Sequence, residues 1–71
     1  MVIDLPGVHV EVKRTESLRL YDAIAQATRD GGTQVPLVLH RRNRSEWLAI
    51  VPLDQLMRLA ELLYLARSAE A

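Results

Sequence analysis

The sequence predicts a small α/β (α+β) domain with a mixed β-sheet, and two patterns carry that prediction. Apolar and polar residues alternate over residues 8–13, as in a half-buried strand, whereas over 16–30 apolar residues recur at steps of three and four, as in a helix. A nearly continuous apolar run at 35–40 is typical of a strand covered on both faces. The expected order is β-β-α-β-β-α within a single domain spanning 1–71.

The chain is expected to begin with a β-hairpin. Residues 1–3 read as the end of a short strand, the Leu-Pro-Gly sequence at 5–7 as a turn, and 8–13 as the returning strand. Because the turn is centred near position 6, Met1 is expected to lie opposite Glu11.

A helix and a second buried strand are expected to follow. Thr15 or Ser17 can cap the helix over 16–30, and the glycine pair at 31–32 ends it because glycine readily takes the left-handed conformation. The strand at 35–40 is expected to lie parallel to the preceding strand, since crossover connections are right-handed.

The C-terminal third reads as a turn, a strand and a helix. A cationic turn at 41–45 leads into a strand over 47–51, Pro52 stops that strand, and Asp54 is a candidate N-cap for a helix over 55–68. This helix is apolar around much of its circumference, which predicts two contact surfaces. One surface is expected to pack on the sheet, and the other on a second subunit of a homo-oligomer or on an absent part of the protein. The alternative is a simple core helix.

Composition excludes several classes of protein. The formal net charge is zero, so binding to nucleic acid has to come from local clusters of cations, and the absence of cysteine excludes disulfides and thiolate chemistry. No signal peptide is recognised, and the most apolar segment is too short and too charged to span a membrane. A cytoplasmic location is therefore expected, as is marginal stability for so short a chain.

The strand at 8–13 carries the residues with the strongest chemical signal. Its valines share one face, so His9, Glu11 and Lys13 project from the other face. A carboxylate can ligate a hard divalent cation, and a lysine two positions along can hold a scissile phosphate or orient an attacking water. The alternative is that these charges line the solvated face of an ordinary amphipathic strand.

Taken together, these motifs resemble the PD-(D/E)XK nuclease superfamily, and more narrowly small phage and prophage endonucleases of the Holliday-junction-resolvase-like type. In that group a Leu-Pro-Gly turn runs into His-Val-Glu-Val-Lys-Arg, as at 5–14. A Gln-Ala pair on the next helix matches 26–27, and an arginine-rich turn before a tryptophan matches 41–47. The resemblance covers about 5–63 and implies a restriction-endonuclease-like core that lacks its N-terminal helix and strand.

The resemblance implies metal-dependent hydrolysis of DNA phosphodiesters. Glu11 would ligate Mg2+ or Mn2+, with the Val12 carbonyl as a possible further ligand. Lys13 would stabilise the pentacovalent phosphate or position the attacking water, and Gln26 would face the site from the helix.

The sequence departs from the family at its start. The family's first acidic ligand aligns with Met1, which cannot replace a carboxylate, and the pairing with Glu11 points to the same position. Affinity for hard cations rises with the number of anionic ligands, so weak metal binding is expected. The chain is therefore expected to be a truncated or late-start form and a poor enzyme, unless a second chain supplies the acid.

The cationic residues near the strand ends are the predicted DNA contacts. These residues are Arg14, Arg41, Arg42 and Arg44. Together with Lys13 they would neutralise about three to five phosphates, so a plot of log affinity against log salt concentration should have a slope of roughly −3 to −4. The alternative is that the turn at 41–45 is simply a solubilising hairpin tip.

Other residues and other functions stay open. His9 could contact phosphate or merely be solvated, His40 is expected to be packed or bonded to a turn, Trp47 to stack on a base or fill the core, and Tyr21 to lie in the core. A DNA-binding or assembly module without catalysis, or a small dimerising regulator such as a toxin-antitoxin partner, would explain some of these features.

Overall fold

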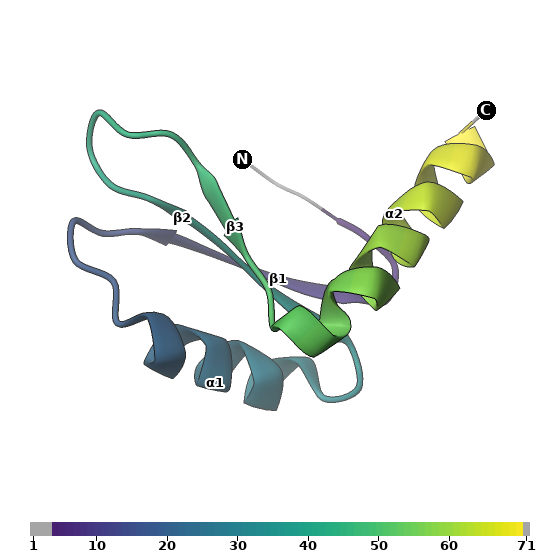
Figure 1. The fold of residues 1–71 in the computed structure, drawn as a ribbon, viewed down its shortest axis with the longest axis horizontal. Coiled ribbons are helices and arrows are strands. Elements are labelled where there is room, and N and C mark those ends of the chain that lie inside the picture. Colours follow the sequence, from purple (N-terminus) through teal and green to yellow (C-terminus); the bar gives the residue numbers. More distant parts are fainter. Residues whose placement is uncertain (1–3, 71) are drawn as a thin grey trace.

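The computed structural model describes residues 4–70 and shows a small α/β domain with the order β-α-β-β-α (Figure 1). This confirms the predicted fold class, while the predicted strand at 1–3 and its pairing of Met1 with Glu11 lie outside the described residues. The elements are β1 (Val8–Arg14), α1 (Leu20–Gly31), β2 (Val35–Arg41), β3 (Leu48–Ile50) and α2 (Leu56–Glu70).

Three strands form one mixed sheet in the order β1-β2-β3. Strand β1 pairs with β2 in parallel, from Val8 opposite Val35 to Arg14 opposite Arg41, and β2 pairs with β3 in antiparallel fashion. The parallel pairing confirms the crossover predicted from the sequence. It also brings the carboxyl ends of β1 and β2 to the same edge of the sheet.

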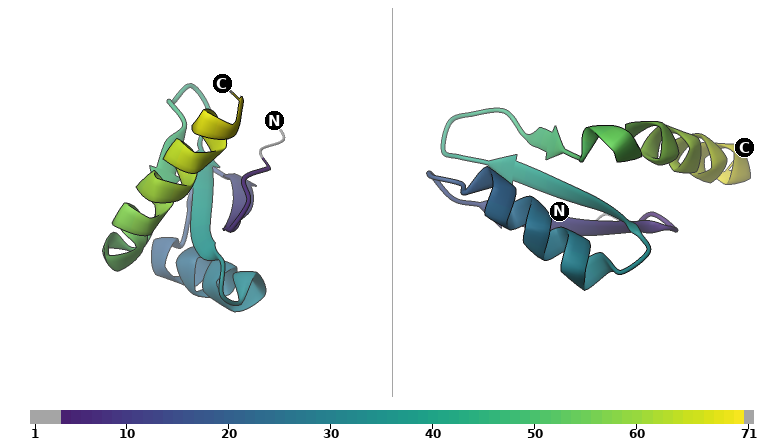
Figure 2. Two further views of the ribbon diagram at one scale, coloured as in Figure 1. Left: turned by 90° about the vertical axis from the view of Figure 1, so that its right-hand side faces the viewer. Right: turned by 60° about the horizontal axis from the view of Figure 1, so that its bottom comes forward.

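The two helices cover opposite faces of the sheet (Figures 1 and 2). On one face, Ala23 and Ala27 of α1 pack against Val38, which is fully buried. On the other face, Leu59 of α2 joins a core of strand residues, namely Val8, Val35, Leu37 and Leu39. The sheet is therefore the middle layer of three, and the face of β1 that carries Glu11 is the face covered by α1.

Helix α1 begins later than predicted, at Leu20 instead of residue 16. The residues before it are held in a loop, because the Thr15 hydroxyl donates to the Ser17 carbonyl and the Glu16 carboxylate accepts the Asn43 N–H. Neither Thr15 nor Ser17 is the N-cap, which is Arg19 in an extended conformation without a side-chain cap. The predicted glycine stop is confirmed at the other end, where Gly32 has a φ of 62°.

The start of the last helix also differs from the prediction. Pro52, with a φ of −59°, leads into a 3-10 turn over Leu53–Gln55, and the Gln55 N–H donates to the Pro52 carbonyl. Asp54 lies inside that turn and is not an N-cap, because coiling begins one residue before it. The preceding strand is shorter than predicted, ending at Ile50.

Helix α2 packs against the sheet mainly through Leu59 and the half-buried Leu62. Much of the rest of its apolar surface is open, with Met57 79% and Tyr64 70% exposed. Tyr21 of α1 is also exposed, so its prediction as a core residue was wrong; the α1 surface that meets the sheet is built from small residues. Within residues 4–70, no helix has the length and apolar character needed to cross a membrane.

Candidate functional site

Glu11 lies between His9 and Lys13 on the face of β1 that is covered by α1. Its Oε1 accepts a hydrogen bond from His9 Nε2 at 3.1 Å, and its Oε2 lies 3.9 Å from Lys13 Nζ. The Glu11 side chain is only 16% exposed. The structure thus places Glu11 and Lys13 together on one face as predicted, while their catalytic roles stay predictions.

The second carboxylate oxygen of Glu11 is under-satisfied. Oε2 is buried and accepts no hydrogen bond from any group in the described part of the chain. A buried carboxylate oxygen without a donor is costly, and the Lys13 ammonium at 3.9 Å compensates only in part. Such an oxygen has free lone pairs for a cation.

Asp30, which was not among the residues predicted from the sequence, brings a second carboxylate to this site. Ligand atoms of His9, Glu11 and Asp30 all lie within 4.8 Å of one another. Two ligands on opposite sides of one ion are about 4 to 5 Å apart, so these groups can hold a single divalent cation with little movement. Two carboxylates and an imidazole suit Mg2+ less well than Mn2+, which accepts nitrogen ligands more readily.

The last residue of α1 allows Asp30 to come close to Glu11. Gly31 is buried, and a Cβ built on it would lie 2.8 Å from the His9 Cβ. Only a residue without a side chain lets the end of the helix come this close to the strand. Because Asp30 directly precedes Gly31, the same contact brings the Asp30 carboxylate to Glu11.

Replacing Gly31 with alanine is expected to destabilise the fold by about 1–2 kcal/mol. The added methyl group overlaps the His9 Cβ, which cannot rotate away, so its cost is in the upper part of the usual range, about 2–3 kcal/mol, and the better helix propensity of alanine offsets only about 1 kcal/mol of it. Thermal or urea unfolding measures the change. Gln26→Ala, at an exposed position of the same helix, is the control and should change stability by no more than about 0.5 kcal/mol; equal stability of the two variants would contradict the packing argument.

Gln26 is exposed on α1, one helical turn before Asp30. Residues four apart lie on the same side of a helix, so Gln26 shares the side of α1 that Asp30 presents to Glu11. The spacing of four residues could have indicated Asp30 from the sequence, because a helix face that includes Gln26 also includes Asp30. The Val12 side chain lies on the opposite face of β1 and is 42% exposed, so only its backbone carbonyl can serve the site.

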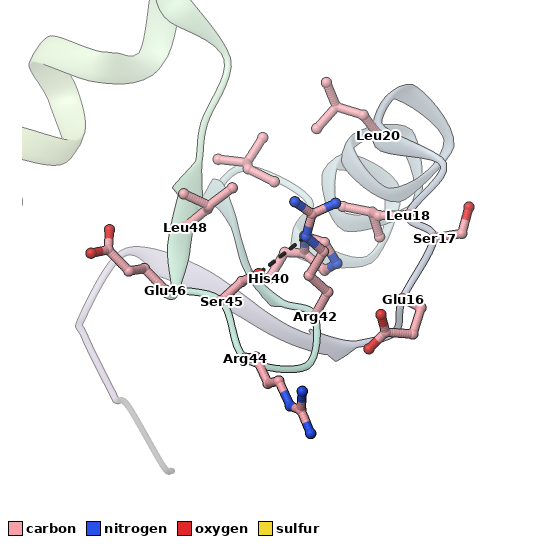
Figure 3. A pocket seen from close by; sticks show the side chains of 11 residues that line it. Glu16, Ser17, Leu18, Leu20, His40, Arg42, Arg44, Ser45, Glu46 and Leu48 are labelled. Carbon is pink, nitrogen blue, oxygen red and sulfur yellow. Dashed lines mark hydrogen bonds between the residues drawn. The ribbon is translucent and has the colours of Figure 1, made fainter.

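The predicted DNA-contacting arginines divide between two pockets at the carboxyl ends of β1 and β2. Arg42 and Arg44 line an open pocket of about 760 Å³ beside the start of α1. In Figure 3 the Arg42 side chain rises toward Leu18, whereas that of Arg44 extends away from the pocket. Arg14 and Arg41 line a smaller pocket of about 330 Å³.

The turn that carries these arginines is tightly bonded. Arg41 Nε donates to the Ser45 carbonyl at 3.0 Å, and Arg42 Nε donates to the Ser45 hydroxyl at 3.1 Å. Trp47 is half-buried against the core, and the Arg41 guanidinium lies 6.0 Å from its ring centroid. The indole therefore packs against the core, which agrees with the core prediction for Trp47.

His40 links the two strand ends. Its Nε2 lies 2.8 Å from the Thr15 carbonyl, so it donates there and fixes the loop that follows β1. This confirms the prediction that His40 is bonded to a turn. His9, by contrast, is 26% exposed and bonded to Glu11, which makes it part of the candidate site instead of a solvated residue.

Comparisons with known proteins do not indicate a family for this chain. No protein-family model, curated protein or solved structure matched the chain. The resemblance to PD-(D/E)XK nucleases therefore stays a prediction, and the cluster of Glu11, Lys13, His9 and Asp30 is the feature that points to a function.

Proposed function

We propose that this chain is a metal-dependent DNA endonuclease domain of the PD-(D/E)XK type, which hydrolyses phosphodiesters and takes branched DNA among its substrates. The observation that supports it best is the buried Glu11 carboxylate, whose Oε2 accepts no hydrogen bond from the side chains described, residues 4–68, or from the backbone of residues 4–70, and lies 3.9 Å from Lys13 Nζ. A carboxylate beside a lysine, next to a second carboxylate, suits a cation and a phosphate together.

Each residue of the cluster has a role in this proposal. When bound, Mg2+ or Mn2+ supplies a Lewis acid that polarises a phosphodiester oxygen. Glu11 and Asp30 are the proposed carboxylate ligands, with the Val12 carbonyl as a further ligand. Without an ion, His9 orients Glu11 through the bond to Oε1, and with an ion bound, its imidazole would be the third side-chain ligand.

The proposed role of Lys13 is electrostatic. The Lys13 side chain is one-third exposed, so its ammonium can approach a substrate phosphate while staying beside Glu11. There it offsets the charge that develops on the phosphate or positions the attacking water. Gln26, on the same side of α1 as Asp30, can hold that water through its amide.

The proposed partner is DNA, held outside this cluster by Arg14, Arg41, Arg42 and Arg44. Cations at the ends of two parallel strands form a local basic patch on a chain that has no net charge. The proposed setting is the cytoplasm of a bacterial or phage-infected cell, where such DNA is found.

The test is a nicking assay with the intact chain on a supercoiled plasmid, on a four-way junction and on a single-stranded oligonucleotide. Strand cleavage is expected with Mg2+ or Mn2+ and none with a chelator. Absence of cleavage with either metal, from folded protein that still binds DNA, would refute catalysis and favour a non-catalytic binding module.

The second candidate, a DNA-binding or assembly module, draws on α2. Its exposed apolar residues favour a homo-oligomer through this helix; they are Leu56, Met57, Leu63, Tyr64 and Leu65. Such a module would bind DNA equally with and without Mg2+. The nuclease, in contrast, needs the metal for cleavage.

Replacing Asp30 with asparagine is expected to weaken Mn2+ binding about 10-fold or more, because the site loses one of two anionic ligands. Calorimetric titration of the folded chain with MnCl2 measures this without DNA. Asp22→Asn, on the exposed part of the same helix, is the matched control and should bind like the wild type. Equal affinities for all three proteins would remove Asp30 from the site.

A further inference from the structure

Arg14 and Arg41 are direct neighbours at the ends of two parallel strands. They are paired in the register of β1 and β2, so their side chains leave the same face of the sheet. Like charges placed opposite each other on adjacent strands repel and destabilise the sheet. An anion bound between Arg14 and Arg41 would therefore relieve this repulsion.

No carboxylate among the described side chains, residues 4–68, forms an ion pair with Arg14 or Arg41. The ion pairs in that range involve other cations, namely His9, Lys13, Arg19 and Arg58. Glu16 lines the same pocket, but its carboxylate accepts the Asn43 N–H at 2.6 Å and forms no ion pair with either guanidinium group. The two guanidinium groups thus have no direct ionic partner within residues 4–68.

The surroundings of the pair suit a phosphate group. The pocket between the loop after β1 and the turn after β2 has a volume of about 330 Å³, with Thr15 and Asn43 in its wall. Arg41 is held in place by its Nε bond to the Ser45 carbonyl and by Trp47, which leaves its terminal amino groups free to donate. Paired guanidinium groups bind phosphate through charge-assisted hydrogen bonds.

The pair lies on the opposite face of the sheet from Glu11 and Lys13. Side chains alternate along β1, so Lys13 projects to the α1 face and Arg14 to the α2 face. The position of Arg41 agrees, because it lies over Trp47, which packs against the core on the α2 face. A DNA strand in contact with both Lys13 and Arg14 has to turn around β1, and because these are the last two residues of β1, the shortest path passes over the carboxyl end of that strand.

We infer that Arg14 and Arg41 together bind one backbone phosphate, and that the DNA strand bends around the carboxyl ends of β1 and β2 to reach Lys13. This inference rests on the proposed function for its DNA partner and narrows the substrate class. Duplex DNA has a persistence length of about 150 bp and resists so sharp a turn, whereas a single strand makes it easily. The substrate class is therefore single-stranded DNA, including the unpaired arms of branched DNA.

The test measures binding of a fluorescent single-stranded oligonucleotide by anisotropy, with chelator present so that nothing is cut. Arg14→Gln and Arg41→Gln are each expected to weaken binding about tenfold. Each should also reduce the slope of log affinity against log salt by about 0.7, the value for one phosphate on a single strand. Arg58→Gln on α2, which removes an exposed cation paired with Glu61, is the control and should bind like the wild type.

The double variant separates one shared phosphate from two independent contacts. If the pair holds one phosphate, Arg14→Gln combined with Arg41→Gln should bind only slightly more weakly than either single variant. Losses that multiply, or single variants that bind like the wild type, would overturn the shared site. Thermal unfolding of each variant in the same buffer identifies any loss of binding that comes from misfolding.

Two further measurements use other probes. Inorganic phosphate should raise the melting temperature of the wild type above its value in chloride of equal ionic strength, and should do so less in either variant. Equal shifts in all proteins would overturn the site. The wild type should also bind the single strand more tightly than a linear duplex of the same sequence; equal affinities would overturn the bent path.

These outcomes are distinct from failure of the nuclease proposal. Loss of binding in the arginine variants, from a wild type that never cuts DNA, would leave the phosphate site standing and refute catalysis. Metal-dependent cutting that needs Glu11, together with unchanged binding by the arginine variants, would leave the nuclease standing and refute the phosphate site.

Discussion

Replacing Glu11 with glutamine is expected to reduce metal-dependent DNA cleavage by a factor on the order of 10³. The amide keeps the size of the side chain and its acceptor oxygen for His9, but it loses the anionic charge that would hold the cation. The measurement is the rate of DNA cleavage at a fixed Mn2+ concentration that just saturates the wild type. Glu61→Gln, on the exposed side of α2, is the matched control and should cleave at the wild-type rate.

Further readouts separate a loss of chemistry from a loss of structure. Glu11→Gln should fold normally, because the substituted amide can donate to neighbouring oxygen atoms and removes a partly desolvated charge. Its calorimetric affinity for Mn2+ should fall together with the cleavage rate. Wild-type cleavage rates in a folded Glu11→Gln protein would end the assignment of Glu11 and, with it, the nuclease proposal.

Replacing Leu59 with alanine is expected to destabilise the protein by about 2–5 kcal/mol. Leu59 is 7% exposed and anchors α2 to the core formed by β1 and β2. Since small domains have only a few kcal/mol of net stability, this loss should leave much of the protein unfolded or α2 detached at room temperature. For a chain of this size, a loss of about 3 kcal/mol lowers the melting temperature by roughly 12–24 °C.

The matched control lies on the same helix. Met57→Ala removes a side chain that is 79% exposed, so its effect should stay within about 0.5 kcal/mol when measured at a protein concentration that keeps the chain monomeric. Circular dichroism during heating follows both variants. Similar melting temperatures for the two would mean that α2 is not attached to the sheet through Leu59.

The candidate site was predictable to the extent that it lies on one strand. The alternation of Val8, Val10 and Val12 with His9, Glu11 and Lys13 is a local, period-two property, and the structure keeps the two sets on opposite faces of β1. The contact of Glu11 with Lys13 follows from this pattern alone. Its surroundings do not, because a strand pattern cannot say which helix covers which face.

Helix boundaries were less predictable, for a physical reason visible at both helix starts. Glu16 and Thr15 had suitable residue types for a helix start, but their side chains bond to Asn43 and Ser17 and hold a loop instead. Asp54 is a good capping residue in isolation, yet Pro52 starts a 3-10 turn before it. In each case a specific contact outweighed a weak local preference.

The sequence by itself determined the α/β class, the parallel pairing of β1 with β2, and the placement of Glu11 beside Lys13, since these depend on local periodicity and on the handedness of the crossover. Only the tertiary structure decided that Asp30 reaches Glu11, because this depends on Gly31 packing against His9. The tertiary structure also decided that Arg14 lies beside Arg41 on the face of the sheet opposite Glu11, because strand register is set by the packing of the whole sheet.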